Sequence, residues 1–289
     1  MILQKEIATI ATQRGVLKST IDKDWALGHF LDAIYTIPEL RQKLIFKGGT
    51  CLKKCYIPDY RFSEDLDFTS NDKEFKLTRK HLNEITSLIK QRVEMPTHIE
   101  SLKELVFKNQ LTGYEAIIKI WGSDHPRNET PPPHQRWQTK IKIEIILYEL
   151  VLFPLASKDI SHSYSDKLTD NALQIPCYTI EEVLAEKMRA LIQRSYTAPR
   201  DFYDIWYLSK HFAELDYKPI VEAFHKKMAF KGYTYTGIDQ LINPENDKPL
   251  SAAWKNSLAH QIQGGLPDYE TVKVNLSSLF LKIFGITKQ

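Results

Sequence analysis

Phe46-Lys-Gly-Gly-Thr-Cys-Leu-Lys-Lys-Cys-Tyr56 and Arg61-Phe-Ser-Glu-Asp-Leu-Asp-Phe68 are neighbouring segments whose residue order predicts the core of the protein. We expect a buried strand, a sharp turn, a short helix and then a second strand. Gly48 and Gly49 permit the turn because neither residue has a Cβ atom. The first N–H groups of the helix that follows can bind a phosphate.

Two carboxylates on the second strand are candidates for metal binding. Asp65 and Asp67 are two residues apart, so both side chains project from one face of a strand, and Ser63 falls on that face too. Mg²⁺ is normally held by carboxylates together with substrate phosphates. Neither the P-loop nor the dinucleotide-binding glycine spacing is present. The alternative is a tight turn beside a solvated acidic strand end, but the two features together favour a nucleoside triphosphate site.

These motifs resemble the signature of a known family. Gly48-Gly-Thr-x-Leu-x-Lys54 followed by Arg61-Phe-Ser-x-Asp-Leu-Asp67 is similar to the signature of the AbiEii-type nucleotidyltransferases, which include the MenT-like group of the polymerase-β-like superfamily. The family's later motifs are a helical lysine and an Arg-Asp-x-Tyr-Asp-Leu-like helix. They match Ala185-Glu-Lys-Met-Arg-Ala-Leu191 and Arg200-Asp-Phe-Tyr-Asp-Ile205, with Ile205 where leucine is usual. The resemblance therefore covers most of the chain.

The resemblance implies an enzyme that acts as a toxin. Members of this family are toxins of bacterial toxin–antitoxin and abortive-infection systems, so we expect Mg²⁺-dependent transfer of NMP from an NTP, with release of pyrophosphate, to an RNA acceptor. The expected acceptor is the 3′ acceptor end of tRNA, where modification would block aminoacylation and translation. A separate antitoxin protein is the expected partner. Two alternatives stay open: nucleotidylylation of a protein or small molecule by the same site, or a non-catalytic nucleotide-binding protein of the same fold.

A third carboxylate is expected on a neighbouring strand, as in other palm-type nucleotidyltransferases. In Lys140-Ile-Lys-Ile-Glu-Ile-Ile-Leu147, isoleucines alternate with charged residues, which predicts a strand with one apolar and one polar face. Glu144 is then the candidate, although an ordinary solvent-facing glutamate explains the pattern equally well. We predict that Asp65, Asp67 and Glu144 hold two Mg²⁺ ions roughly 3.5–4 Å apart.

The NTP substrate requires groups that bind its triphosphate. The predicted ligands are backbone groups of the glycine turn and nearby polar side chains, namely Gly48, Gly49, Thr50, Lys54, Ser63 and Lys187. Lys187 lies on the apolar stripe of its predicted helix, where a lysine is costly unless it has a partner or a polar cleft to reach. Snorkelling from the edge of the stripe is the alternative.

An aspartate on the next predicted helix is expected to complete the catalytic site. Asp201 and Asp204 are three residues apart and share one helix face. The resemblance implies that one of them orients Lys187 or the incoming base, and the sequence does not distinguish between the two. A solvated helix face is the alternative.

The bulk properties restrict the class of protein. The chain has 289 residues, enough for one large or two modest domains, and a net charge of +3 that permits a nucleic-acid partner without requiring one. No apolar run approaches the ~20 residues of a membrane helix, and no signal peptide is evident, so we expect a cytoplasmic protein. Three cysteines cannot form a closed disulfide framework, no Cys-x-x-Cys pair suggests zinc, and packing is the expected role of Cys51 and Cys55. The isolated histidines are not predicted to be ligands: His125, His134 and His162.

The expected fold class is α/β (α+β), a polymerase-β-like nucleotidyltransferase core with a small mixed sheet, followed by an α-helical C-terminal half. The expected domains are 1–178, with N-terminal helices, and 179–289, with the active site in the cleft between them. The expected strands are 43–47, 65–69, 102–108, 114–121 and 139–148. The expected helices are 22–36, 50–56, 74–92, 180–194, 199–211, 217–229, 249–261 and 267–284. A proline-rich loop is expected over 122–134.

Overall fold

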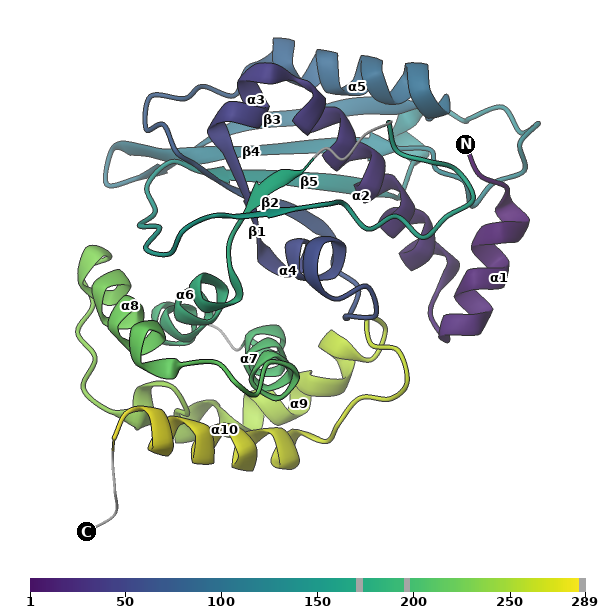
Figure 1. Ribbon diagram of the computed structural model, residues 1–289. Helices are drawn as coiled ribbons and strands as arrows, with labels where there is room; N and C mark the ends of the chain where they lie inside the picture. Colours follow the sequence, from purple (N-terminus) through teal and green to yellow (C-terminus); the bar gives the residue numbers. More distant parts are fainter. Residues whose placement is uncertain (170–173, 195–197, 286–289) are drawn as a thin grey trace. The chain divides into compact units, whose positions relative to one another are not determined.

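The computed structural model describes residues 1–169, 174–194 and 198–285 and divides into two compact units (Figure 1). The first unit comprises residues 1–149 and 155–177, and the second comprises 150–154 and 178–289. The division near residue 178 lies where the sequence pattern changes from mixed to helical. Residues 150–154 belong to the second unit, whereas the predicted domains placed them in the first.

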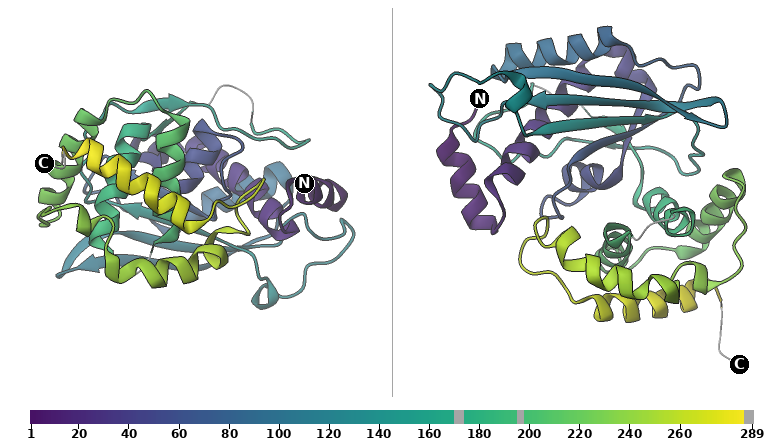
Figure 2. Two further views of the ribbon diagram at one scale, coloured as in Figure 1. Left: turned by 90° about the horizontal axis from the view of Figure 1, so that it is seen from below. Right: turned by 180° about the vertical axis from the view of Figure 1, so that it is seen from behind.

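In the described part of the first unit, seven strands form a sheet with the order β3-β4-β5-β2-β1-β7-β6. The strands are β1 (Leu44–Lys47), β2 (Asp65–Ser70), β3 (Thr97–Phe107), β4 (Gln110–Ile120), β5 (Lys140–Ile146), β6 (Ala156–Lys158) and β7 (Ile175–Cys177). β1 is antiparallel to β2 and parallel to β7, whereas β2 is parallel to β5. The sheet is therefore mixed, and the β3–β4 hairpin forms one of its edges (Figure 2).

The described part of the first unit also contains helices. They are α1 (Gln4–Arg14), α2 (Lys18–Thr36), α3 (Pro38–Lys43), α4 (Gly48–Cys51) and α5 (Arg79–Val93), with a π-helical turn η1 (Leu52–Tyr56) and a 3₁₀ turn η2 (His134–Arg136). α2 and α5 pack against each other and contact the strands beneath them (Figure 1). α2 is buried along most of its length, which makes it the central helix of the core.

Alternation along β2 and β5 gives the sheet two different faces. The apolar members of these strands are buried in the core: Leu66, Phe68, Ile141, Ile143 and Ile145. The ring centroids of Phe68 and Tyr35 on α2 are 6.1 Å apart, so this face packs against α2. Successive side chains point to opposite faces of a strand. Half-buried Asp67 and Glu144 therefore lie on the other face.

The described part of the second unit contains helices α6 (Ile180–Gln193), α7 (Pro199–His211), α8 (Tyr217–Phe230), α9 (Asp247–Leu258) and α10 (Tyr269–Ile283), with 3₁₀ turns η3 (Ile238–Gln240) and η4 (Pro244–Asn246). The Thr179 hydroxyl accepts the Glu182 N–H at 3.3 Å and so caps α6. The Glu182 carboxylate accepts the N–H groups of Leu152 and Phe153 at 2.8 Å each. These bonds explain why 150–154 belongs to the helical unit.

Several predicted boundaries were wrong, each for a local reason. The helix predicted over 74–92 begins at Arg79, because Thr78 caps it in a reciprocal capping box with His81. The strand predicted from residue 102 begins at Thr97, since its first residues pair with the end of β4. The helix predicted over 50–56 begins at the glycine turn and becomes π-helical at Leu52. The short elements α1, β6 and β7 lacked a strong periodic signal and were not predicted.

Candidate active site

The glycine turn lies directly against the acidic strand. Gly48 has a φ of 79°, in the left-handed region that glycine adopts without strain. A Cβ atom on Gly48 would lie 2.3 Å from Asp67 Oδ2, and one on Gly49 would lie 2.9 Å from Ser63 Oγ. Both glycines are therefore needed, because the turn passes within contact distance of the Asp67 and Ser63 side chains.

Thr50 fastens this turn to the strand. Its hydroxyl donates a hydrogen bond of 2.5 Å to the Asp65 carbonyl, and the residue is buried. The helix that follows also packs against β2. Residues 48–50 and Asp65 are thus held together by backbone and side-chain contacts, as the order of the sequence motifs predicts.

The sheet register places the predicted metal ligands side by side. Asp67 on β2 is paired with Glu144 on β5, and Asp65 is paired with Lys142. Glu144 is in turn opposite Glu115 on β4. We call Asp65, Asp67 and Glu144 the carboxylate row. The residue that the sequence left uncertain, Glu144, is the direct neighbour of Asp67.

Negative charge exceeds positive charge in the carboxylate row. The pKa of Asp67 is raised from 3.8 to about 6, first by burial and then by the charges of Glu144 and Asp65, against a smaller opposing effect of Lys47 and Lys142. Ionised Asp67 is therefore costly without a cation. Hard oxygen ligands with an unbalanced charge suit a divalent ion such as Mg²⁺.

Lys142 neutralises part of this charge. Its Nζ lies 2.8 Å from Glu144 Oε2 and 3.8 Å from Glu115 Oε2. Burial lowers the pKa of Lys142, but the hydrogen bond to Glu144 and the charges of Asp65 and Asp67 outweigh burial and raise it. Lys142 is thus a built-in counter-ion for the polar face of β5.

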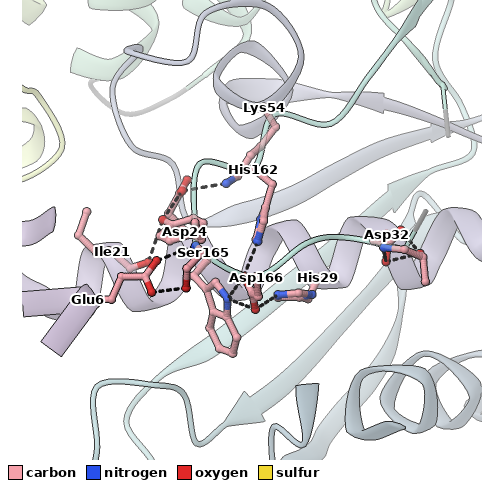
Figure 3. A network of polar contacts seen from close by, with 12 residues as sticks. Glu6, Ile21, Asp24, His29, Asp32, Lys54, His162, Ser165 and Asp166 are labelled. Atoms are coloured by element: carbon pink, nitrogen blue, oxygen red, sulfur yellow. Dashed lines mark hydrogen bonds and ion pairs between the residues drawn. The ribbon is translucent and has the colours of Figure 1, made fainter. Parts of the chain in front are cut away.

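Lys54 pairs with Asp24 on α2, and not with a residue of the carboxylate row, in the contacts described. Its Nζ lies 2.8 Å from Asp24 Oδ2 and 5.7 Å from the centre of the Tyr164 ring, and its side chain is almost fully buried (Figure 3). Tyr164 also donates to the same Asp24 oxygen at 2.7 Å. The structure therefore gives Lys54 an ion pair with Asp24, and its contact with a phosphate stays a prediction.

The remaining predicted residues form a compact group within the second unit. Lys187 Nζ on α6 lies 3.0 Å from Asp201 Oδ1 and 2.6 Å from Asp204 Oδ2 on α7. Arg194 also pairs with Asp201. Asp204 is fully buried and the Lys187 side chain is 12% exposed, so two carboxylates fix the position of one lysine. Both candidate aspartates thus contact Lys187.

Sequence reasoning overlooked two cationic side chains at the glycine turn. Lys47 is paired with Asp67 across β1 and β2, and its charge lowers the pKa of Asp67. Arg61 Nη2 lies 3.0 Å from the place a Cβ of Gly49 would occupy. Both residues belong to the quoted segments, so their charge beside a predicted phosphate turn was the available signal. Glu115 was also overlooked, because a single glutamate in an otherwise mixed strand gives no such signal.

A strand, a tight glycine turn and an Asp-x-Asp strand, with a further carboxylate in register, define a nucleotidyltransferase core. The family model described as "Nucleotidyl transferase AbiEii toxin, Type IV TA system" matches residues 29–275, and the chain belongs to this family. It is therefore a nucleotidyltransferase of a toxin family, and the resemblance seen in the sequence is confirmed.

Solved structures support the same fold. MenT4, a nucleotidyltransferase toxin from Mycobacterium tuberculosis, is 17% identical, with a TM-score of 0.66 over 100% of this chain and 91% of MenT4. JHP933 from Helicobacter pylori is 16% identical, with a TM-score of 0.52 over 93% of this chain and 94% of its own. The predicted fold class is confirmed by these likenesses. Among curated protein sequences, none matches this chain significantly.

Two further properties follow from the family and the structure. A type IV toxin–antitoxin family implies an NTP substrate and an antitoxin partner. Among the described residues, no helix is both long enough and apolar enough to cross a membrane.

Proposed function

We propose that this chain transfers NMP from an NTP to an RNA acceptor, the 3′ acceptor end of tRNA, in a reaction that requires Mg²⁺. The observation that carries the proposal is the direct pairing of Asp67 with Glu144, beside a glycine turn that touches Asp67. Modification of that tRNA end would prevent aminoacylation and stop translation. This is the action expected of a cytoplasmic toxin whose antitoxin is a separate protein.

The carboxylate row fits the metal that the proposal requires. Asp65, Asp67 and Glu144 supply only oxygen ligands, and burial together with the charges of Glu144 and Asp65 raises the pKa of Asp67, a cost that a bound cation would relieve. We assign all three residues as ligands of two Mg²⁺ ions. When bound, such a pair lowers the pKa of an attacking hydroxyl and neutralises the leaving pyrophosphate.

The triphosphate is assigned to groups of the glycine turn. Backbone groups of 48–50 and the Ser63 hydroxyl are proposed ligands, and the adjacent guanidinium of Arg61 adds positive charge. Lys187 is proposed as a further phosphate ligand, positioned by Asp201 and Asp204. Arg194 also pairs with Asp201, so two aspartates and two cationic side chains leave this group neutral overall. An arriving phosphate would exchange with a carboxylate for the Lys187 ammonium.

Labelled nucleotide identifies both the activity and the acceptor. The purified protein is incubated with total bacterial RNA, Mg²⁺ and each α-labelled NTP in turn. The inactive control is the double variant Asp65→Ala/Asp67→Ala. Asp72→Ala is a matched control, because Asp72 follows the same strand but pairs with Lys43 at 2.8 Å.

We expect label in a tRNA-sized band with the unmodified protein and Asp72→Ala, and none with the double variant. If protein or a small molecule were labelled and RNA were not, the acceptor would be that protein or small molecule and not RNA. NTP binding without transfer to any acceptor would contradict a catalytic role.

A further inference from the structure

The chain contains three cysteines, and the fold brings all of them together. Cys51 ends α4, Cys55 lies in η1, and Cys177 ends β7, more than a hundred residues later in the chain. Their sulfur atoms all lie within 4.8 Å of one another. Cys177 reaches the other two because β7 pairs in parallel with β1, in register with Phe46 just before the glycine turn.

The cysteine cluster is enclosed and has a polar neighbour. Cys51 and Cys177 are fully buried, whereas Cys55 is half-buried and leaves one side accessible. The Tyr56 hydroxyl lies 3.8 Å from Cys177 Sγ. Lys158 Nζ lies 4.8 Å from the centre of the Tyr56 ring and brings a positive charge to this side.

The three cysteines affect one another's protonation. Hydrogen bonds from the Cys51 and Cys55 thiols lower the pKa of Cys177 to about 4. Burial raises the pKa of Cys51 well above its ordinary value, and hydrogen bonding to Cys177 raises that of Cys55. One thiolate is thus shared by two thiol protons, and a cation could take the place of those protons.

We propose that Cys51, Cys55 and Cys177 bind one Zn²⁺ ion through their three sulfur atoms. Three Zn–S bonds form, two S–H bonds break, and two protons are released to solvent. The product carries a net charge of −1, and nearby Lys158 offsets it. The Tyr56 hydroxyl or a water molecule occupies the fourth position.

The geometry and the chemistry both favour zinc. Tetrahedral Zn²⁺ with Zn–S bonds of about 2.3 Å places neighbouring sulfurs about 3.8 Å apart, a small contraction from the observed upper limit. Thiolates select soft ions such as Zn²⁺ and Cu⁺ over Mg²⁺. A monovalent ion would leave a second uncompensated negative charge in the core, which is costly. The site is chemically distinct from the all-oxygen carboxylate row.

The position of the cluster connects it to the glycine turn. Cys51 immediately follows Thr50, whose hydroxyl is bonded to the Asp65 carbonyl. A bound ion would join α4 and η1 to β7 by covalent-strength bonds. We therefore expect zinc to raise the thermal stability of the chain, independently of any catalytic activity.

Metal titration of the reduced, chelator-stripped protein tests this site. Zn²⁺ is titrated against a competing chromophoric chelator with Mg²⁺ in excess, which keeps the carboxylate row from taking zinc. Cd²⁺ then replaces Zn²⁺ as an optical probe, because thiolate ligation produces a charge-transfer band. The variants are Cys51→Ser, Cys55→Ser and Cys177→Ser, with folding checked by circular dichroism. His162→Gln is the matched control, since His29, His162 and Asp166 form a second group of possible ligands within 4.8 Å.

We expect one Zn²⁺ per chain, release of two protons and a Cd²⁺–thiolate band. Each cysteine variant should lose affinity by on the order of 100-fold or more, whereas His162→Gln should bind as the unmodified chain does. The unmodified protein alone can overturn the proposal, even if a variant fails to fold. Absence of zinc binding would do so, and so would zinc binding without the Cd²⁺–thiolate band.

Discussion

Two groups of carboxylates in the first unit balance their charge in opposite ways. In the carboxylate row, burial and neighbouring carboxylates raise the pKa of Asp67 to about 6. The second group lies in residues 161–169, a segment that crosses α2 and that we call the strap (Figure 3). In the strap, Asp166 accepts the Trp25 indole N–H at 2.9 Å. The Nε2 atoms of His29 and His162 lie 3.0 Å and 2.9 Å from the same carboxylate. Burial would raise the pKa of Asp166, but hydrogen bonds from His162, His29 and Trp25 hold it well below its usual range.

The opposite pKa shifts of Asp67 and Asp166 distinguish a carboxylate suited to binding a ligand from one that stabilises the fold. Asp166 has all the donors it needs from the protein, so it stabilises the fold through the strap. Thr169 in the strap likewise donates to the buried Asp32 on α2, at 2.5 Å. Asp67 instead has Glu144 and Asp65 as neighbours, and Lys47 and Lys142 offset only part of the rise in its pKa. A carboxylate kept at a cost in stability is the expected mark of a functional site.

Asp67→Asn should have the largest effect and should separate activity from stability. We expect nucleotidyl transfer to fall by on the order of 1,000-fold, because a metal ligand and its charge are lost. The free energy of unfolding in the absence of metal should rise by on the order of 1–3 kcal/mol at neutral pH, because the cost of burying the charge and the repulsion with Glu144 and Asp65 are removed. Labelled transfer and urea denaturation measure the two effects. If Asp67→Asn lost both activity and stability, Asp67 would not differ from Asp166 in its contribution to the fold.

Gly48→Ala should damage the carboxylate row through geometry alone. The added methyl would need to lie 2.3 Å from Asp67 Oδ2, at a φ of 79° that alanine adopts only with strain. We expect transfer to fall by on the order of 100-fold, as a displacement of about 1 Å would produce. Gly15→Ala is the matched control, because Gly15 also has a positive φ, of 65°, but has no neighbour within 4 Å. Equal losses in both variants would show that backbone strain, and not contact with Asp67, is responsible.

Asp166→Asn should show the reverse of Asp67→Asn. An amide can accept fewer of the hydrogen bonds from Trp25, His29 and His162 and has no charge, so we expect a loss of about 2–3 kcal/mol in the free energy of unfolding. Transfer per folded molecule should be unchanged. Chemical denaturation with an activity assay below the transition measures both. Loss of activity without loss of stability would place the strap within the catalytic machinery.

The pH dependence of stability should show the smallest effect and sharpen the comparison. The pKa of Asp67 is raised from 3.8 to about 6 in the folded chain, so the folded state binds a proton more tightly than the unfolded state. The destabilisation by ionised Asp67 is therefore fully present above pH 6 and disappears as the pH falls toward 4. The advantage of metal-free Asp67→Asn over the unmodified protein should shrink across the same range. An advantage independent of pH would contradict the raised pKa.

The sequence predicted the carboxylate row better than its surroundings. Asp-x-Asp and the alternation around Glu144 place side chains on a face by local geometry alone, and the β2–β5 register then joins them. The environment of Lys54 could not be predicted, because its partner Asp24 lies on α2 and comes close only through tertiary packing. His162, predicted to be isolated, lies 2.9 Å from Asp166, and its ring centre is 4.9 Å from that of His29. The cysteine cluster also depends on a long-range strand pairing that no short motif reveals.

The most direct test of the carboxylate row as the catalytic centre compares three proteins in one assay. Transfer of labelled NMP to RNA with Mg²⁺ is measured for the unmodified chain, Asp67→Asn and Asp166→Asn, at a temperature where denaturation curves show all three to be folded. We predict transfer by the unmodified chain and by Asp166→Asn, and a loss on the order of 1,000-fold in Asp67→Asn. Undiminished transfer by folded Asp67→Asn would contradict the assignment of the carboxylate row as the catalytic centre.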